Sequence, residues 1–198
     1  MQKEFSIILL TIIFISIIPV SAGAQEPDST LGAESYDKGM VSYKAEKYPE
    51  AIRFFDLATQ YFGEKYPAGH AKSLEWIGYG YLRMSEGRTL IEYFKKAEYY
   101  ARKAQKKNGD YSPLINNQLM LAMMLRDMNE PREALEYFKN LEDLINQSEP
   151  NPLYLSIIYQ NRAIIAMESE KFELVPNYLE KATLFAARSG NKRQYISV

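Results

Sequence analysis

The feature that most constrains this chain is an apolar pattern that returns four times along it. Each copy starts at a small or branched residue, and the residues four, seven and eleven positions further on are apolar in all but one case. The four starting residues are Ala51, Ala97, Ala134 and Val175. Positions spaced in this way lie on one side of a helix with 3.6 residues per turn. Each segment is therefore predicted to be a helix with an apolar stripe that it cannot bury alone.

A second helical stretch precedes each of these segments. In three copies it carries a small residue twelve positions before the starting residue, at Gly39, Ala122 and Ala163. In the second copy the small residue is Gly78, nineteen positions before Ala97, so we interpret that copy as having seven extra residues. A small side chain at this position lets two paired helices approach closely. The chain is thus predicted to form four helical hairpins.

Helix start signals recur along the chain, and apolar residues recur at three and four positions rather than at two. Proline is tolerated in the first turn of a helix, and prolines stand at the expected starts of five of them: Pro49, Pro67, Pro113, Pro131 and Pro152. About eight helices and an all-α fold are predicted.

The repeated pattern resembles the tetratricopeptide repeat (TPR) family, whose unit is a helix-turn-helix of about 34 residues with small residues at three positions. The first position is matched by Gly39, Gly78, Ala122 and Ala163, the second by Ala51, Ala97, Ala134 and Val175, and the third by Ala58, Ala104, Leu141 and Ala182. The resemblance spans residues 32–190 and implies a right-handed α-solenoid of about four stacked TPR-like repeats. The wider spacing of the units here is similar to that of the longer-repeat variants.

Two features depart from the family pattern. Ser35 and Ser42 stand where the family places large apolar residues, so the first helix is expected to be shifted or loosely packed. Pro176 lies early in the last helix, where it is tolerated only within the first turn or at a kink.

Residues 1–24 are predicted to be a secretory signal peptide. Lys3 precedes an uncharged apolar run, Pro19 interrupts the run, and Ala22-Gly23-Ala24 has the small-x-small pattern that signal peptidase accepts. Cleavage before Gln25 would leave an exported protein in a bacterial periplasm or cell envelope.

The alternative for this end of the chain is an uncleaved membrane anchor, because residues 5–24 are about as long as a bilayer core requires. Residues 25–31 are polar and are predicted to be a flexible leader. Residues 191–198 are predicted to be a tail or the truncated start of a capping helix. A short cap, a longer protein and a partner that completes the stack remain open for that tail.

Composition and motifs argue against catalysis. Lysines and arginines number 24 against 25 acidic residues, so no overall charge favours nucleic acid. The absence of cysteine excludes thiolate metal sites and cysteine nucleophiles. His70 is the only histidine and is expected to be a surface residue or a helix-start contact. With no phosphate-binding or metalloprotease motif, we predict no enzyme activity, no cofactor and no metal site.

One basic series could in principle bind an anionic partner. It consists of Lys95, Lys96, Arg102, Lys103, Lys106 and Lys107, with Tyr99 and Tyr100 among them. Because this series lies on a second, outer helix of a hairpin, we interpret it as a solvated convex face, and an anionic partner is the alternative.

The resemblance implies a concave groove lined by the first helix of each unit, where such solenoids bind peptides. The family's groove positions fall on Tyr36, Met40 and Tyr43; Lys72, Glu75, Tyr79 and Leu82; Asn116, Leu119, Met123 and Arg126; and Ile157, Gln160, Ile164 and Met167. From these we predict a partner-binding set of Tyr36, Met40, Tyr43, Lys72, Tyr79, Asn116, Met123, Arg126 and Gln160. The alternative is that these side chains pack between adjacent repeats.

The predicted function is a non-catalytic protein-interaction scaffold of the periplasm or cell envelope that binds a protein or peptide segment in this groove. No nucleic-acid partner is expected, and a membrane contact only through an uncleaved signal. The alternative is the extracytoplasmic TPR sensory region of a larger membrane-bound regulator of the sensor-kinase type. A transmembrane helix and a signalling domain encoded directly after Val198 would favour the alternative. The sequence does not determine the oligomeric state.

Overall fold

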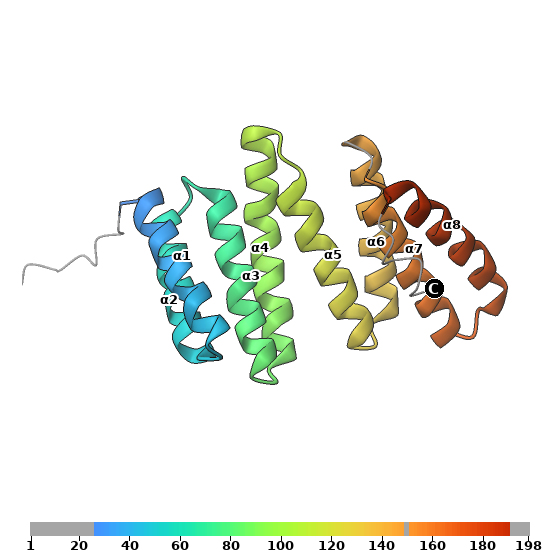
Figure 1. Ribbon diagram of the computed structural model, residues 1–198, viewed down its shortest axis with the longest axis horizontal. Helices are drawn as coiled ribbons and strands as arrows, with labels where there is room; N and C mark the ends of the chain where they lie inside the picture. Colours follow the sequence, from blue (N-terminus) through green and yellow to red (C-terminus); the bar gives the residue numbers. More distant parts are fainter. Residues whose placement is uncertain (1–25, 149–150, 191–198) are drawn as a thin grey trace, which may run out of the picture.

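In the computed structural model, the described residues, 26–148 and 151–190, form eight α-helices and one short 3-10 helix, with no strand among them. The α-helices are α1 (Ser29–Lys44), α2 (Tyr48–Phe62), α3 (Pro67–Arg83), α4 (Gly87–Asn108), α5 (Ser112–Asp127), α6 (Pro131–Gln147), α7 (Pro152–Glu168) and α8 (Val175–Ser189), and the 3-10 helix η1 (Phe172–Leu174) precedes α8. These α-helices pair into four hairpins, and Figure 1 shows the hairpins stacked along the long axis of the molecule. The predicted all-α solenoid of four hairpins is confirmed.

The first helices of the hairpins, α1, α3, α5 and α7, are called the A-helices, and their partners α2, α4, α6 and α8 the B-helices. Each helix packs against the next along the chain, and successive A-helices also contact one another. Among the described helices, no two B-helices approach each other to the same extent. The stack is therefore tighter along the A-helices, as in a solenoid that curves towards them.

All four hairpins use the same turn between their A- and B-helix. The residues with positive φ in these turns are Glu46 (60°), Ser85 (66°), Asn129 (62°) and Glu170 (58°). In each turn the next residue donates its N–H to a carbonyl five residues back, as Lys47 does to Ser42 at 2.9 Å. This bond is the one that closes a Schellman-type helix end, so one local geometry sets the hairpin four times.

These turns correct the predicted register of the second repeat. In the other three repeats, the starting residue of the stripe lies five positions after the residue with positive φ. In the second repeat that residue is Ser85, and the residue five positions later is Leu90, not Ala97. Leu90 is buried, and it lies twelve positions after Gly78, as in the other repeats. The prediction of seven extra residues before Ala97 is wrong, because the stripe of the long helix α4 continues for two more turns. A shift of seven residues corresponds to about two helical turns, so it brings the stripe back to the same side of the helix.

The first hairpin is packed tightly rather than loosely. The side of α1 that faces α2 carries only small residues, and Ser35 and Ser42 are buried on it. A Cβ added at Gly39 would lie 2.6 Å from the Phe55 ring, and one added at Gly32 would lie 2.7 Å from the Phe62 ring. The two phenylalanine rings therefore lie directly on the α1 backbone, and the expectation of a loose or shifted first helix is wrong.

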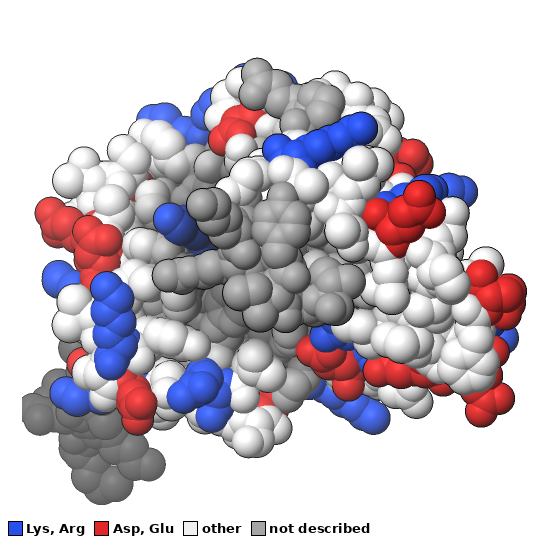
Figure 2. All heavy atoms as spheres, turned by 45° about the vertical axis from the view of Figure 1, so that its right-hand side comes forward, with Lys and Arg blue, Asp and Glu red and all other residues white. Residues whose placement is uncertain are grey.

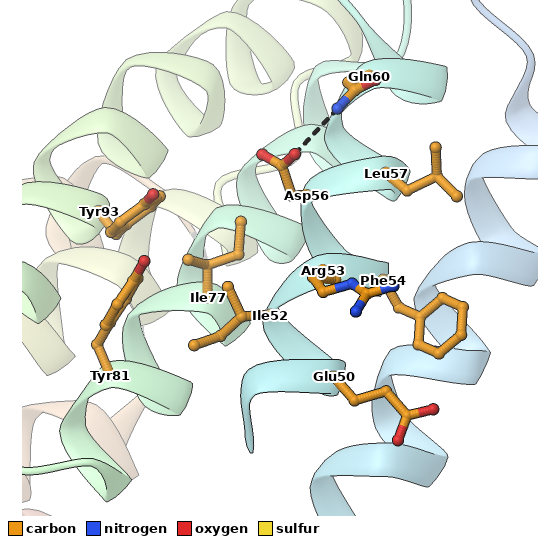
Figure 3. A pocket seen from close by; sticks show the side chains of 10 residues that line it. All are labelled: Glu50, Ile52, Arg53, Phe54, Asp56, Leu57, Gln60, Ile77, Tyr81 and Tyr93. Atoms are coloured by element: carbon orange, nitrogen blue, oxygen red, sulfur yellow. Dashed lines mark hydrogen bonds between the residues drawn. The ribbon is translucent and has the colours of Figure 1, made fainter. Parts of the chain in front are cut away.

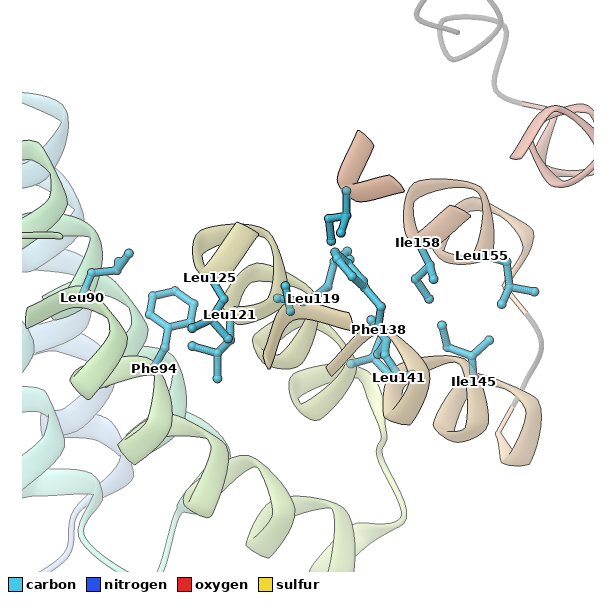
Figure 4. Packing of buried hydrophobic residues seen from close by; sticks show 14 residues of the cluster. Leu90, Phe94, Leu119, Leu121, Leu125, Phe138, Leu141, Ile145, Leu155 and Ile158 are labelled. Atoms are coloured by element: carbon cyan, nitrogen blue, oxygen red, sulfur yellow. The ribbon is translucent and has the colours of Figure 1, made fainter. Parts of the chain in front are cut away.

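The apolar stripes of the B-helices form the core. Figure 4 shows the cluster that runs from α4 to α7, with Phe94, Leu121 and Phe138 among its buried members. In the last hairpin Ala182 and Ala186 are buried, while Val175 and Leu179 are only half-buried. Pro176 lies in the first turn of α8, one of the two places where it was expected to be tolerated.

The start of the repeat region is slightly earlier than predicted. Asp28 caps α1, because its Oδ1 accepts hydrogen bonds from the Thr30 N–H at 2.7 Å and from the Leu31 N–H at 3.1 Å. Residues 29–31 are therefore helical and not part of a leader. The predicted signal peptide, 1–24, and the predicted tail, 191–198, lie outside the described residues.

Candidate functional site on the A-helices

The nine residues predicted to bind a partner all lie on A-helices, and they differ in exposure. Lys72 and Asn116 are exposed. The other seven are half-buried: Tyr36, Met40, Tyr43, Tyr79, Met123, Arg126 and Gln160. Several of these side chains contact the next A-helix, as Tyr43 of α1 does through Trp76 of α3.

An aromatic cluster joins α1 to α3 around Trp76. Its ring meets Tyr43 edge-on at 4.9 Å and Tyr79 at 5.3 Å between centroids. The Lys72 ammonium lies 5.0 Å from the centre of the Tyr36 ring, a cation–π distance. Burial raises the pKa of Tyr36 to about 12, so its hydroxyl is protonated at neutral pH.

The structure thus brings four of the predicted residues, Tyr36, Tyr43, Lys72 and Tyr79, to one end of the A-helix face. Sequence reasoning missed Trp76, which is the only tryptophan and stands directly after a predicted groove position, Glu75. The position of Trp76 next to Glu75 was the signal in the sequence that could have identified Trp76 as part of the site.

A buried polar pair joins α3 to α5. Asn117 Nδ2 donates a hydrogen bond of 3.0 Å to the Glu75 carboxylate, and Asn117 is fully buried. Burial raises the pKa of Glu75 to about 7, and the Asn117 hydrogen bond and the Lys72 charge only partly oppose this rise. The Asn117 Oδ1 atom has no hydrogen-bond partner. The pair was not predicted, because nothing in the sequence shows that an asparagine beside a groove position turns inward.

Two further contacts join α5 to α7. The Tyr154 hydroxyl donates to Asn116 Oδ1 at 2.6 Å, and the Arg126 guanidinium donates to Asn161 Oδ1. Gln160 Nε2 is buried and has no hydrogen-bond partner. Met40 and Met123 pack at the edges of two different buried clusters. The predicted set therefore forms a row along the A-helices rather than one compact site.

An exposed apolar row borders this face at the C-terminal ends of the A-helices. Its members are Leu82 (39% exposed), Met84 (38%), Met128 (39%) and Met167 (45%), and we call them the edge row. Leu82 and Met167 correspond to each other, three residues before the positive-φ residue of their turns, and Met84 and Met128 correspond to each other, one residue before it. The four residues thus stand near the A-helix ends of the second, third and fourth repeats. Leu82 and Met167 stood at groove positions in the sequence, whereas Met84 and Met128 were missed because they lie at the helix ends.

A hollow of about 710 Å³ lies on the opposite side, between α2 and α4. Figure 3 shows Ile52 and Ile77 in the middle of this hollow and the rings of Tyr81 and Tyr93 side by side on one wall. These two rings stack with centroids 5.5 Å apart. Both acidic and basic side chains, including Arg53 and Asp56, stand around it, so the hollow has no single charge preference.

Half of the basic series on α4 is paired with acidic side chains. Lys95 pairs with Glu133 at 2.9 Å, Arg102 pairs with Glu98 at 2.6 Å, and Lys103 pairs with Glu64. In the view of Figure 2, acidic and basic side chains are likewise interspersed. These contacts support the interpretation of a solvated outer face over that of an anion-binding one.

His70 lies in the first turn of α3, where it makes local contacts. Its Nδ1 is 3.0 Å from the Gly63 carbonyl oxygen, and its ring stacks on Tyr100 at 3.6 Å. Burial lowers the pKa of His70. In the part of the chain that the structure describes, no group of three His, Asp or Glu side chains is arranged to hold a metal ion.

Comparison with known proteins supports the fold. No protein-family model and no curated protein matches the sequence. A solved structure of a Podosopora anserina protein, described as a kinesin light chain with nearly identical TPR-like repeats, is similar with a TM-score of 0.63 and 11% identity. The match covers 81% of this chain and 77% of that chain. The chain therefore has a TPR-like helical-repeat fold, as the sequence resemblance implied.

Proposed function

We propose that this TPR-like solenoid is a non-catalytic protein-interaction scaffold that binds a segment of a partner protein along its A-helices. The observation that carries the proposal is the edge row, Leu82, Met84, Met128 and Met167, which leaves large apolar side chains exposed in consecutive repeats. Helical-repeat solenoids commonly bind partners along such an extended surface. Methionine adapts its shape to different apolar partners, which suits this use.

In this proposal the partner's apolar side chains pack on the edge row while polar groups set its position. Lys72 and Asn116 are exposed and can pair with a partner's carboxylate or backbone groups. Tyr36, Tyr43 and Tyr79 hold the shape of the face through their contacts with Phe55, Trp76 and Phe94, and they offer the partner only their accessible edges.

The proposed location is the bacterial periplasm or cell envelope, and it rests on the signal-like sequence of residues 1–24. Within residues 26–148 and 151–190, no helix combines the length and the apolar character needed to cross a membrane.

The edge row can be tested without disturbing the core. A variant with Leu82→Ser, Met128→Ser and Met167→Ser changes only exposed residues, so we expect its circular dichroism spectrum to be unchanged. Its matched control carries Tyr99→Ser and Leu184→Ser, which change exposed apolar residues of α4 and α8. Each protein is immobilised and incubated with an envelope extract, and the retained proteins are quantified.

We expect the edge-row variant to lose the main retained partner at least tenfold, because apolar area is removed from the contact surface. The control should retain that partner at the wild-type level. Equal retention by the edge-row variant and the wild type would show that the binding surface lies elsewhere.

A sensory region of a larger membrane-bound regulator is the second candidate. It is favoured by exposed Met167 on α7, the last A-helix that the structure describes. A signalling protein would use the surface around Met167 to pass a change in the stack to a following segment. A gene whose reading frame continues into a transmembrane helix would support this candidate.

A further inference from the structure

The exposed methionines of the described chain lie on one surface. The sequence has eight methionines and no cysteine, and all of the methionines but Met1 lie in the part of the chain that the structure describes. Met84, Met128 and Met167 are exposed, and all three belong to the edge row. The other four are half-buried: Met40, Met120, Met123 and Met124. A small reagent that attacks sulfur from solution therefore meets the edge row first.

The half-buried methionines take part in the packing of the cores. Met40 packs against the buried cluster around Phe55, and three more pack against the cluster that runs from α4 to α7: Met120, Met123 and Met124. Close packing leaves little room for an incoming reagent or for an added oxygen atom. We therefore expect these four side chains to react more slowly than the edge row.

The exposed methionines stand where the hairpin turns already fix the backbone. The Met84 N–H donates to the Tyr81 carbonyl oxygen at 3.0 Å, and the Met167 carbonyl oxygen accepts from the Glu170 N–H at 3.1 Å. Met128 holds the same place in its turn as Met84. These bonds involve the main chain only. A chemical change at the side-chain sulfur therefore alters the surface without removing a bond that holds the turn.

Two-electron oxidants such as hypochlorous acid convert thioethers into sulfoxides. The sulfur attacks the chlorine and displaces hydroxide, and water then replaces chloride on the sulfur. In total, a thioether and hypochlorous acid give a sulfoxide, a proton and a chloride ion, so the chlorine gains the two electrons that the sulfur loses. Cysteine thiolates, which compete for such oxidants in other proteins, are absent from this sequence.

We propose that Met84, Met128 and Met167 form a reversible oxidation site, and that their conversion into sulfoxides by hypochlorous acid or a related two-electron oxidant releases the partner from the edge row. The inference rests on the proposed function, since the same surface binds the partner. A sulfoxide is polar, and its oxygen loses hydration when an apolar partner covers it. Methionine sulfoxide reductases reverse the change, so the site can return to its binding form.

Leu82 makes the expected effect uneven along the edge row. It carries no sulfur, so the second repeat keeps one apolar member of the row after oxidation. Met128 and Met167 are the only members of the row in the third and fourth repeats. Replacing both of them by leucine should therefore preserve more binding under oxidation than replacing Met84 alone.

The selectivity of the oxidation can be measured without a partner. The full chain is treated with a limiting amount of hypochlorous acid, and peptide mass spectrometry follows the gain of one oxygen atom at each methionine. We expect the three edge-row methionines to react at least about ten times faster than the four half-buried ones, with an unchanged circular dichroism spectrum. Equal rates for the two groups would overturn the proposal.

A matched pair of variants connects the oxidation to binding. One variant carries Met84→Leu, Met128→Leu and Met167→Leu, which removes the exposed sulfur and keeps apolar side chains of similar volume. The control carries Met40→Leu and Met123→Leu, at two half-buried sites. The probe is the main envelope protein that the immobilised wild type retains. Its retention is measured before oxidation, after oxidation, and after treatment of the oxidised protein with methionine sulfoxide reductases.

We expect oxidation to weaken retention by the wild type and by the control at least about tenfold, and reductase treatment to restore it. The edge-row leucine variant should retain the envelope protein equally before and after oxidation. An equal loss in the leucine variant, or a loss that the reductases do not reverse, would overturn the proposal.

The serine variant of the edge row separates this inference from the proposed function. If the oxidised wild type retains the envelope protein while the variant with Leu82→Ser, Met128→Ser and Met167→Ser loses it, the oxidation site is wrong and the proposed function stands. Full retention by the serine variant would overturn the proposed function, and the release step with it, whatever the oxidation rates.

Discussion

Glu75 of α3 and Asn117 of α5 form a hydrogen-bonded pair that lies between the second and third repeats. Asn117 Nδ2 donates to the Glu75 carboxylate at 3.0 Å, while Asn117 Oδ1 has no donor. A protonated Glu75 could donate its own proton to that oxygen and satisfy both groups. Together with burial, this arrangement favours the neutral acid.

Stability is therefore expected to fall as the pH rises through this carboxyl. Burial raises the folded-state pKa of Glu75 to about 7, above the usual value of 4.5. Between these values the folded state binds more protons than the unfolded state, so raising the pH favours unfolding. The loss is on the order of 3 kcal/mol and is complete above pH 7. Urea denaturation of the wild type and of Glu75→Gln between pH 4.5 and 8 measures this contribution.

The Glu75→Gln variant should lose this part of the pH dependence and be more stable than the wild type at pH 8. Glu50→Gln, which changes an exposed carboxylate on α2, serves as the control and should keep the wild-type slope. A Glu75→Gln profile parallel to that of the wild type would show that Glu75 titrates normally.

The close approach of α1 and α2 predicts a graded response to added methyl groups. Gly39→Ala places a Cβ 2.6 Å from the fully buried Phe55 ring, so we expect it to destabilise the protein by about 1 to 3 kcal/mol. Gly78→Ala meets Phe94 at 3.0 Å and Leu90 at 3.3 Å, and a smaller shift accommodates it. Thermal unfolding of both variants gives the order, and an equal or reversed order would contradict the packing described for the first hairpin.

The corrected register of the second repeat makes a separate prediction. Leu90→Ala removes buried side-chain volume where α3 and α4 meet, so it should cost about 2 to 5 kcal/mol. Asn108→Ala changes an exposed residue at the end of α4 and should cost less than about 0.5 kcal/mol. Denaturant midpoints distinguish the two. Leu90→Ala with no measurable effect would restore the register that starts at Ala97.

The shared turn offers a stabilising substitution. Glu46 has a φ of 60°, a conformation that costs a residue with a side chain roughly 1 kcal/mol and glycine little. Glu46→Gly should therefore raise the stability by up to about 1 kcal/mol, less the extra entropy that glycine gains in the unfolded chain. Asn129→Gly should give a smaller gain, because asparagine tolerates this region better. Calorimetric Tm values of both variants provide the comparison, and a lower Tm for Glu46→Gly would argue against strain in the turn.

The sequence predicted the hairpins well and the face between them poorly. The stripe at Ala134, Phe138 and Leu141 was identified correctly because a single helix determines its own periodicity, and all three residues are fully buried. The periodicity does not determine which turn of a helix packs against its partner helix. The stripe of α4 is longer than one repeat needs, so the sequence allowed Ala97 where the structure has Leu90.

The candidate site shows the same limit. The sequence placed Tyr36, Tyr43 and Tyr79 on the A-helix face, and they lie there in the structure. Part of each side chain, however, packs against other residues of the solenoid, so only the remaining edge is accessible to a partner. Trp76 and Asn117 were missed because their importance comes from contacts with Tyr43 and Glu75, which lie 33 and 42 residues earlier in the sequence.

By itself, the sequence determined the helices, their pairing into four hairpins and the class of fold, because local periodicity and small residues at close contacts depend on neighbours along the chain. Only the tertiary structure decided the register of α4, the buried Glu75–Asn117 pair and the exposure of the edge row. The register of α4 depends on where α3 ends and the turn at Ser85 begins. The other two depend on how one repeat is rotated against the next, and that rotation is set by contacts between residues far apart in the sequence.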